Sequence, residues 1–177
     1  MDLPQSIESL KSVIRDVPDF PKKGVVFKDL TTLLNDPAAF RLAVDLLVKQ
    51  CGDLKATRVV AIESRGFIWG AALADRLGLA FVPVRKPGKL PWRTLSASYA
   101  LEYGSDSLEI HADAVRPGES VLVVDDLIAT GGTAQAAGSL VGRLGASVAA
   151  YVFLVELGFL GGREKLAGCD VRALIRY

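Results

Sequence analysis

The stretch Val121-Leu122-Val123-Val124-Asp125-Asp126-Leu127-Ile128-Ala129-Thr130-Gly131-Gly132-Thr133 decides the fold. Its first four residues are a continuous apolar run, which is typical of a strand covered on both faces of a sheet. We expect a turn from Asp125 to Thr133, followed by a helix over 134–144 that ends at Gly145. A strand, a turn and a helix in this order predict an α/β unit.

The same alternation continues through the rest of the chain. Apolar patterns predict further strands at 59–62, 79–84, 147–155 and 171–175, and a helix at 67–77. Near the start we expect a helix reaching Val17 and an extended segment at 25–27. Asp36-Pro37 is a second helix start signal, and helical spacing continues over 40–50. These elements predict an α/β fold with a mostly parallel central sheet flanked by helices. The length of 177 residues favours a single domain, 1–177.

Composition excludes several classes of function. The formal net charge of +1 argues against an electrostatic grip on nucleic acid or on an anionic membrane. No apolar run approaches the length of a membrane span. The two cysteines form no C-x-x-C pair, and residues 1–4 show no basic-then-apolar signal, so we expect a cytoplasmic protein.

The turn after the 121–124 strand has the chemistry of a sugar phosphate site. Asp125 and Asp126 come to the carboxyl end of a buried strand, where open α/β sheets bind ligands. Carboxylates suit sugar hydroxyls, directly or through a hydrated magnesium ion. Backbone amides at a helix N-terminus suit a phosphate. The residues expected to form this cradle are Ala129, Thr130, Gly131, Gly132 and Thr133. The alternative without function is a tight turn whose aspartates are solvated. A P-loop is disfavoured because the lysine that its motif requires is absent here.

A second anion site is expected where the 59–62 strand ends. Glu63, Ser64, Arg65 and Gly66 lead from that strand into a helix, so exposed amides and a guanidinium come together. The alternative is a surface ion pair between Arg65 and Glu63.

The segment from 85 to about 107 interrupts the alternation of strands and helices. It carries Arg85, Lys86 and Lys89 among glycines and prolines, and we expect a functional loop or hairpin. A mobile basic lid of this kind could close over pyrophosphate and exclude water. A solvated charged loop is the alternative.

The 121–133 stretch resembles the phosphoribosyl-pyrophosphate binding motif of the type I phosphoribosyltransferases. Three further patterns resemble the adenine phosphoribosyltransferases within that superfamily. Residues 98–104 match S-Y-x-L-E-Y-G of their flexible loop, and Pro18-Asp19-Phe20-Pro21 with Gly24-Val25-Val26-Phe27 matches their N-terminal hood. Arg65 falls on the arginine of their pyrophosphate loop. Glu63 stands where an aspartate is common, and Trp92 and Arg93 depart from their lid pattern.

The resemblance implies a type I phosphoribosyltransferase fold with a hood at about 1–35 and a flexible catalytic loop at about 85–107. It implies transfer of phosphoribose from 5-phosphoribosyl-1-pyrophosphate to adenine, which gives AMP and pyrophosphate. The implied catalytic residues are Glu102, Asp125, Asp126 and Arg65. The implied pyrophosphate contacts are Glu63, Ser64, Arg65, Gly66, Arg85, Lys86 and Lys89. The implied adenine contacts are Val26, Phe27, Lys28 and Leu157.

The resemblance also implies Mg²⁺ as cofactor, held mainly by the substrate rather than by direct protein ligands, and a homodimer. His111, the lone histidine, is not expected to be catalytic. Two alternatives stay open at this point. One is a phosphoribosyltransferase for guanine, hypoxanthine or orotate. The other is a regulator that binds the sugar pyrophosphate without catalysis.

Overall fold

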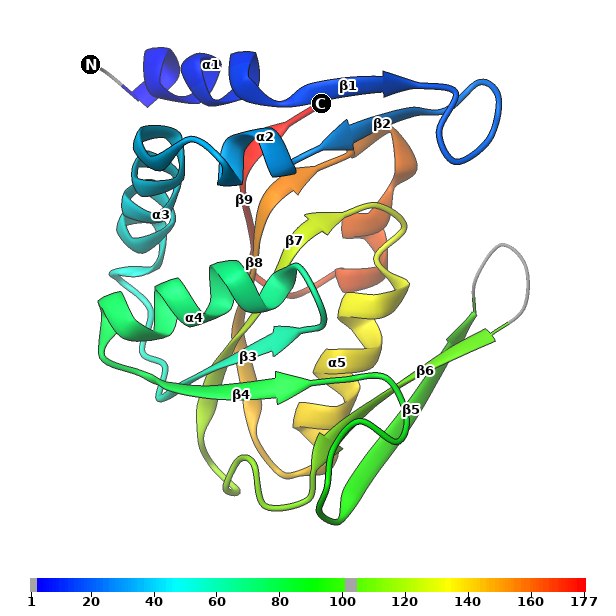
Figure 1. The fold of residues 1–177 in the computed structure, drawn as a ribbon. Coiled ribbons are helices and arrows are strands. Elements are labelled where there is room, and N and C mark those ends of the chain that lie inside the picture. Colours follow the sequence, from blue (N-terminus) through cyan, green and yellow to red (C-terminus); the bar gives the residue numbers. More distant parts are fainter. Residues whose placement is uncertain (1–2, 101–104) are drawn as a thin grey trace. The chain divides into compact units, whose positions relative to one another are not determined.

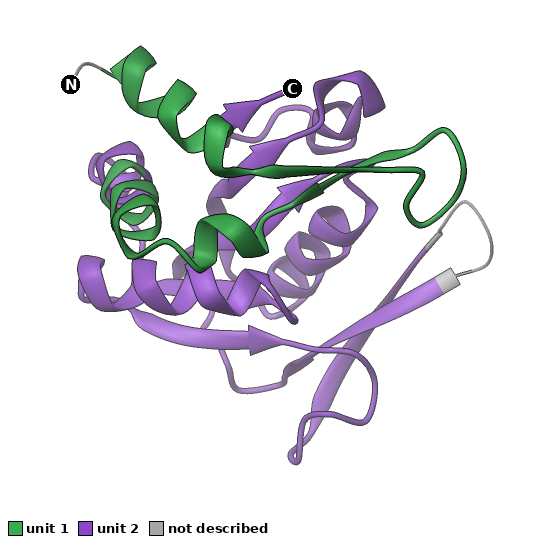
Figure 2. Cartoon of the chain, turned by 45° about the horizontal axis from the view of Figure 1, so that its top comes forward, with its two compact units in different colours: residues 1–46 green, residues 47–177 purple. Residues whose placement is uncertain are grey.

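The computed structural model of the chain describes residues 3–100 and 105–177. The chain divides into two compact units, residues 1–46 and residues 47–177 (Figure 2). The first unit contains α1 (Leu3–Val13), β1 (Arg15–Pro18), β2 (Val26–Asp29), α2 (Thr31–Leu34) and residues 37–46 of α3 (Pro37–Cys51).

The first helix ends four residues before the predicted position. Val17 pairs with Phe27 in the antiparallel ladder between β1 and β2. Val17 is therefore part of a strand and does not extend the helix by a fourth turn. The helical spacing of Ile14 and Val17 could not reveal this ladder, because its partner lies ten residues away. The predicted start of α3 is confirmed: Oδ1 of Asp36 accepts the backbone N–H groups of Ala38 and Ala39 at 2.9 and 3.0 Å.

The second unit is built on one sheet (Figure 1). Its elements are β3 (Arg58–Ile62), α4 (Gly66–Leu77), β4 (Ala80–Val84), β5 (Thr94–Ala100), β6 (Ser105–His111), β7 (Ser120–Ile128), α5 (Gly132–Arg143), β8 (Ser147–Glu156), the 3₁₀ turns η1 (Gly158–Leu160) and η2 (Gly162–Leu166), and β9 (Val171–Arg176). Five strands lie in the order β4-β3-β7-β8-β9, and every neighbouring pair is parallel. The predicted α/β fold with a parallel sheet is confirmed.

The strand order creates a switch point between β3 and β7. Helix α4 carries the chain from β3 outward to β4, whereas α5 carries it from β7 outward to β8, in the opposite direction. The crevice at the carboxyl ends of two such strands is where open α/β sheets bind ligands. The apolar residues 59–62 of β3 and 121–124 of β7 are fully buried, so both strands are held rigidly beneath this crevice.

The segment predicted as a functional loop or hairpin contains a regular hairpin, β5–β6, paired from Thr94–His111 to Ala100–Ser105. Arg85 forms an isolated bridge with Glu109 of β6, and Nη1 of Arg143 in α5 donates to the carbonyl of Ser96 at 2.5 Å. The hairpin is thereby tied to the sheet and to α5. Within residues 3–100 and 105–177, no helix is long and apolar enough to cross a membrane.

Candidate active site

Two strand–turn–helix units meet at the switch point. The turn after β3 leads into α4 at Gly66, and this glycine lies directly against β7. A Cβ atom at Gly66 would come within 2.7 Å of Oδ1 of Asp125 and within 3.1 Å of the carbonyl oxygen of Val124. Only a residue without a side chain permits this approach. The turn carrying Arg65 is therefore brought beside the two aspartates.

Strand β7 continues through the residues that were predicted to form a turn. Its ladder with β8 includes Asp125 and extends to Ile128, so both aspartates lie within the strand. Successive strand residues point to opposite faces of a sheet, which gives the two carboxylates different surroundings. Asp126 is buried, and its Oδ2 lies 2.5 Å from Nε of Arg65. Arg65 is thus paired with a buried carboxylate of the neighbouring strand.

A cleft of about 370 Å³ lies over these residues. It brings together seven residues that the sequence singled out in three separate segments of the chain, namely Glu63, Ser64, Arg65, Lys86, Asp125, Asp126 and Thr133. Its lining is Ile62, Glu63, Ser64, Arg65, Lys86, Tyr99, Leu108, Asp125, Asp126, Leu127 and Thr133. The lining is mainly polar and charged, and this suits an anionic, hydroxylated ligand.

The two adjacent aspartates differ in electrostatics. Burial raises the pKa of Asp125 well above its ordinary value, and the negative charge of Asp126 raises it further. The hydrogen bond that Oδ1 of Asp125 accepts from the backbone N–H of Asp126, 2.9 Å long, and the charge of Arg65 act in the opposite direction. An unliganded site therefore holds one carboxylate whose charge is poorly compensated.

A smaller hollow of about 100 Å³ adjoins the cleft at the start of α5. Its lining includes Asp125, Leu127, Ile128, Ala129, Thr130, Gly131, Thr133, Ala134 and Phe153. The first backbone N–H groups of a helix have no partner within the helix, so they are available to an anion. Four of the five residues predicted for the phosphate cradle line this hollow, namely Ala129, Thr130, Gly131 and Thr133.

Gly131 serves the cradle in a way that the sequence did not reveal. Its φ of +77° favours glycine, and a Cβ here would overlap the carbonyl oxygen of Gly162 and approach its carbonyl carbon to 3.0 Å. The glycine therefore permits contact with η2 behind the loop. A separate glycine pair, Gly161-Gly162, was the one available signal that backbones meet there.

Two of the three predicted lid cations, Arg85 and Lys86, are paired with carboxylates in this structure. Nε of Arg85 donates to Oε2 of Glu63 at 2.9 Å, and Nζ of Lys86 contacts Oδ2 of Asp106 and the hydroxyl of Tyr99. The carbonyl of Lys89 accepts a 3.3 Å bond from Nη1 of Arg85. A pyrophosphate ligand would have to exchange partners with these carboxylates.

The expected adenine contacts are divided between the two units. Val26, Phe27 and Lys28 lie in β2 of the first unit, where the rings of Phe27 and Phe20 meet edge to face at 5.2 Å. Leu157 belongs to the second unit and follows β8, with its N–H bonded to the carbonyl of Ile128 at 3.0 Å. Glu102 lies outside the described residues.

Comparisons with known proteins agree with this geometry. The family model for the phosphoribosyl transferase domain matches residues 29–166. A curated relative from Anaeromyxobacter sp. (strain Fw109-5), named adenine phosphoribosyltransferase, is 55% identical over 177 residues and covers 100% of both chains. Another, with the same name, from Carboxydothermus hydrogenoformans is 55% identical over 168 residues, 95% of this chain and 99% of its own.

Solved structures lead to the same family. The adenine phosphoribosyltransferase of Thermoanaerobacter pseudethanolicus superposes with a TM-score of 0.94 at 54% identity, over 97% of this chain and 99% of that one. The Saccharomyces cerevisiae enzyme, solved with adenine and an imino-altritol bisphosphate, gives a TM-score of 0.91 at 41% identity, with coverage of 97% and 99%.

The fold and the cleft are thus those of a phosphoribosyltransferase, a pentosyltransferase enzyme that uses a sugar pyrophosphate. Within this class, the chain belongs to the adenine phosphoribosyltransferase family. The reaction predicted from the sequence, phosphoribosyl transfer to adenine, is confirmed, and the alternatives of another base or of a regulator without catalysis fall away.

The raised pKa of Asp125 predicts a stability effect with a definite sign. An ionised Asp125 is less favourable in the folded chain than in the unfolded chain, so stability falls as the pH rises through the carboxyl range. Asp125→Asn keeps the oxygen acceptor but cannot ionise. We expect it to raise the free energy of unfolding at pH 7, measured by urea denaturation, and the gain to shrink in acid.

Glu119→Gln is the matched control with the opposite sign. Hydrogen bonds from Arg58 and from the N–H of Arg116 lower the pKa of Glu119 to about 2, so its contribution is present at pH 7 and is lost in acid. This variant should be less stable at pH 7. Equal effects of both substitutions on the free energy of unfolding would contradict the assignment.

Proposed function

We propose that the two anion-binding turns bind opposite ends of the sugar pyrophosphate, one the 5'-phosphate and the other the pyrophosphate, and that Asp125 and Asp126 contact the sugar. The observation that carries this proposal is the contact of Gly66 with Asp125, which brings the turn after β3 against the strand that leads into the second turn. Residues 129–133 take the 5'-phosphate at the N-terminus of α5. Ser64 and Arg65 take the pyrophosphate, with assistance from Glu63, Gly66 and the cations Arg85, Lys86 and Lys89.

The aspartates suit the chemistry of the sugar. The bond from the anomeric carbon to pyrophosphate breaks as the bond to N9 of adenine forms, and pyrophosphate leaves with the electron pair. Positive charge develops on the sugar during this displacement. The carboxylate of Asp125, poorly compensated without ligand, gains a favourable partner when that charge appears. Both carboxylates also accept hydrogen bonds from ribose hydroxyls.

Magnesium fits as a cofactor shared with the substrate. Mg²⁺ is ordinarily bound by one or two carboxylates together with substrate phosphates and water. Among the described residues, no group of three or more His, Cys, Asp or Glu side chains is arranged to hold a metal, whereas Asp125 and Asp126 supply carboxylates at the cleft. Bound there, the ion would neutralise charge on the departing pyrophosphate.

Adenine is read by the hood and by the turn after β8. In the hood, Phe27 would stack on the base and backbone groups of Val26 and Lys28 would meet its edge, and in the second unit Leu157 is the candidate for a stacking contact. Glu102 exchanges a proton with N7, which keeps the base neutral as the bond from N9 to the sugar forms. These roles rest on the family motifs that residues 24–28, 98–104 and 157 match.

Two product fragments test the division of the substrate. Thr130→Val removes a hydroxyl from the cradle, and Arg65→Lys removes a guanidinium while keeping the charge beside Asp126. Hydrogen bonds to charged groups contribute about 1.5–3 kcal/mol, so each affinity should fall about ten- to hundredfold. By calorimetry, Thr130→Val should weaken ribose 5-phosphate and Arg65→Lys should weaken pyrophosphate. The reverse pattern would exchange the two assignments.

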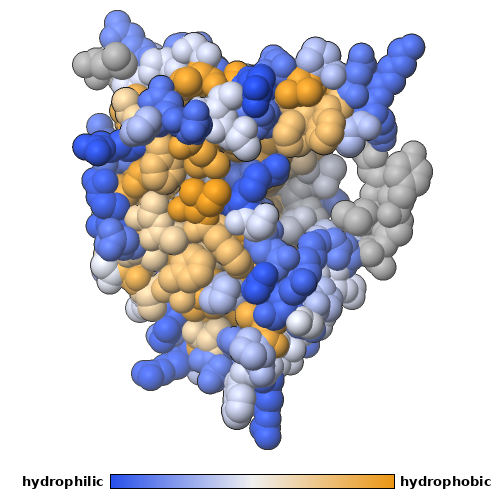
Figure 3. Space-filling model, viewed as in Figure 1, coloured by the Kyte–Doolittle hydropathy of each residue, from blue (hydrophilic) through white to orange (hydrophobic). Residues whose placement is uncertain are grey.

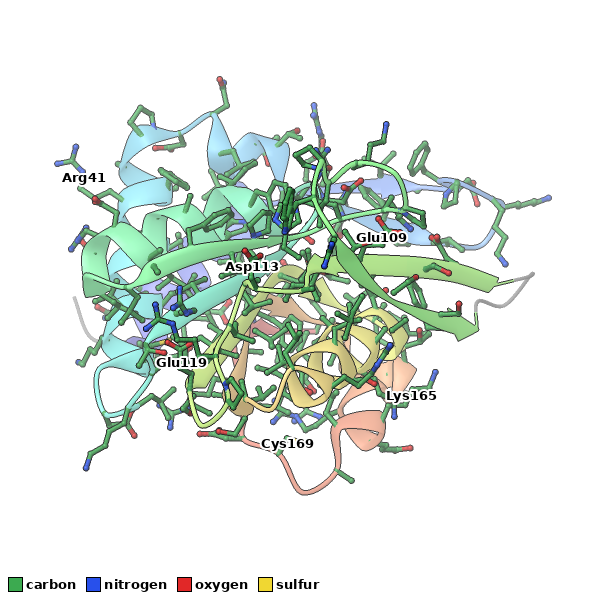
Figure 4. The ribbon with its side chains drawn as sticks, turned by 90° about the horizontal axis from the view of Figure 1, so that it is seen from below. Arg41, Glu109, Asp113, Glu119, Lys165 and Cys169 are labelled. Carbon is green, nitrogen blue, oxygen red and sulfur yellow. The ribbon has the colours of Figure 1, made fainter. Side chains whose placement is uncertain are left out.

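Single-turnover kinetics test Glu102. Glu102→Gln should bind both substrates almost normally, but the chemical step should slow by about 10²–10⁴, the range of general acid–base catalysis. Glu109→Gln is the control on the same hairpin, because Gln can still accept the 3.1 Å bond from the N–H of Gly88 (Figure 4 labels Glu109). An unchanged chemical step in Glu102→Gln would remove Glu102 from the mechanism.

We further infer that the chain forms a homodimer through α4 and β4. Apolar side chains gather over these two elements (Figure 3). Ile68 and Phe81 are 39% and 38% exposed, and the ring of Phe81 meets that of Phe67 at 5.7 Å. β4 is also the last strand at one edge of the sheet. An apolar face beside an edge strand is typical of a surface that another protein covers.

Light scattering tests the dimer. The parent chain should have the mass of two chains, and Ile68→Asp should shift it to the mass of one, because a buried unpaired carboxylate opposes association. Phe159→Asp, at a side chain 73% exposed on η1, should remain dimeric. A monomeric parent chain, or a dimeric Ile68→Asp, would contradict this interface.

The chemistry of the two cysteines supports a place in the reducing cytoplasm. Cys51 and Cys169 are both free thiols, and burial raises the pKa of the Cys51 thiol to about 11. Neither cysteine is needed by the proposed chemistry.

A further inference from the structure

The loop at residues 129–131, here called the phosphate loop, packs directly against η2. A Cβ at Gly162 would overlap the carbonyl oxygen of Ala129 and approach the amide nitrogen of Gly131 to 2.9 Å. The two backbones are therefore in direct contact, with no side chain between them. Any displacement of Gly162 moves the loop in front of it, because close-packed backbone transmits small shifts.

Arg163, the residue after Gly162, is anchored to two strands of the sheet. Its Nε and Nη2 donate to the two carboxylate oxygens of Glu156 at 3.1 and 2.5 Å, and its Nη1 donates to the carbonyl of Val171 at 2.6 Å. Glu156 is the last residue of β8, and Val171 is the first residue of β9. The planar guanidinium thus sets the position of η2 against both strands, with a geometry that lysine cannot reproduce.

The energetics favour a geometric role for this pair. Glu156 is only 3% exposed, and a carboxylate in such a place is costly unless it is paired and hydrogen-bonded. The pair is only partly buried, because the side chain of Arg163 is 44% exposed. Ion pairs that water reaches contribute little to stability, so stability alone does not explain the pair. Arg163 lowers the pKa of Glu156, so the pair stays ionised at neutral pH.

We infer that Glu156 and Arg163 are positioning residues for the 5'-phosphate, which they fix in place through Gly162 and the loop at 129–131. The inference rests on the proposed role of residues 129–133 and extends it. Neither residue touches the cradle. Both act by fixing the position of η2 behind the cradle. Their loss should therefore lower the affinity for the phosphate end of the substrate and leave the affinity for the pyrophosphate end unchanged.

Two variants avoid a trivial loss of folding. Arg163→Lys keeps the positive charge beside Glu156 but loses the fork, that is, the pair of hydrogen bonds from Nε and Nη2 to the two carboxylate oxygens. The double variant Glu156→Gln/Arg163→Met removes both charges together and leaves no buried carboxylate unpaired. Arg58→Lys is the matched control, since Arg58 forms a similar fork on Glu119 at 2.7 and 3.0 Å at the amino ends of the strands (Figure 4 labels Glu119).

Calorimetry with ribose 5-phosphate and, separately, with pyrophosphate gives the decisive readout. We expect both Arg163 variants to bind ribose 5-phosphate about tenfold or more weakly, because small misplacements at a site are costly. Pyrophosphate affinity should change by less than about twofold, as for distant sites. In turnover, KM for the sugar pyrophosphate should rise more than kcat falls. Arg58→Lys should leave all these quantities unchanged.

The outcomes separate this inference from the function on which it rests. Unchanged ribose 5-phosphate affinity in both Arg163 variants, while Thr130→Val weakens it, would overturn the positioning role alone. Equal losses for ribose 5-phosphate and pyrophosphate would also overturn it, because a general loosening of the fold has that signature. If Thr130→Val itself has no effect on ribose 5-phosphate, the cradle assignment fails and the positioning role fails with it.

Discussion

The contact between Gly66 and Asp125 is the constraint on which the rest of the site depends. Two parallel strands can bring their following turns to one edge, but a helix that begins there must clear the neighbouring strand. Because Gly66 has no side chain, α4 can start directly against β7, whereas a Cβ placed there would lie only 2.7 Å from Oδ1 of Asp125, closer than ordinary packing allows. The guanidinium of Arg65 then reaches Asp126, and one crevice holds both turns.

The charged side chains of this crevice do not compensate one another fully, and a ligand of complementary charge would complete their pairing. One arginine stands beside two consecutive carboxylates, and the pKa of Asp125 is raised by burial and by Asp126. Lys86 and Arg85 are near but are held by Asp106 and Glu63. A substrate that brings phosphates and a developing positive sugar completes both halves of this balance, because the phosphates attract the cations and the sugar attracts the carboxylates.

The cradle also has a support of its own. Its front is a helix N-terminus that offers backbone donors, and its back is a second backbone at Gly162 that leaves no room for a side chain on either partner. Rigid support behind a binding loop lowers the entropy that must be lost when the phosphate is bound. The fork of Arg163 on Glu156 ties that support to β8 and β9, the strands that continue the sheet away from the switch point.

The sequence by itself determined most of the strands and helices and the residue types in the two turns, because both are written in neighbouring residues. The apolar run before Asp125-Asp126 and the glycines after it predicted the strand, the cradle and the family, and Arg65 was placed in the second anion turn. Only the tertiary structure decided which strands are neighbours, that Arg65 pairs with Asp126, that Val17 leaves its helix for a ladder, and that Gly162 and Arg163 stand behind the phosphate loop. Each of these depends on groups that are brought together by pairing and packing between distant segments, and local spacing carries no record of such contacts.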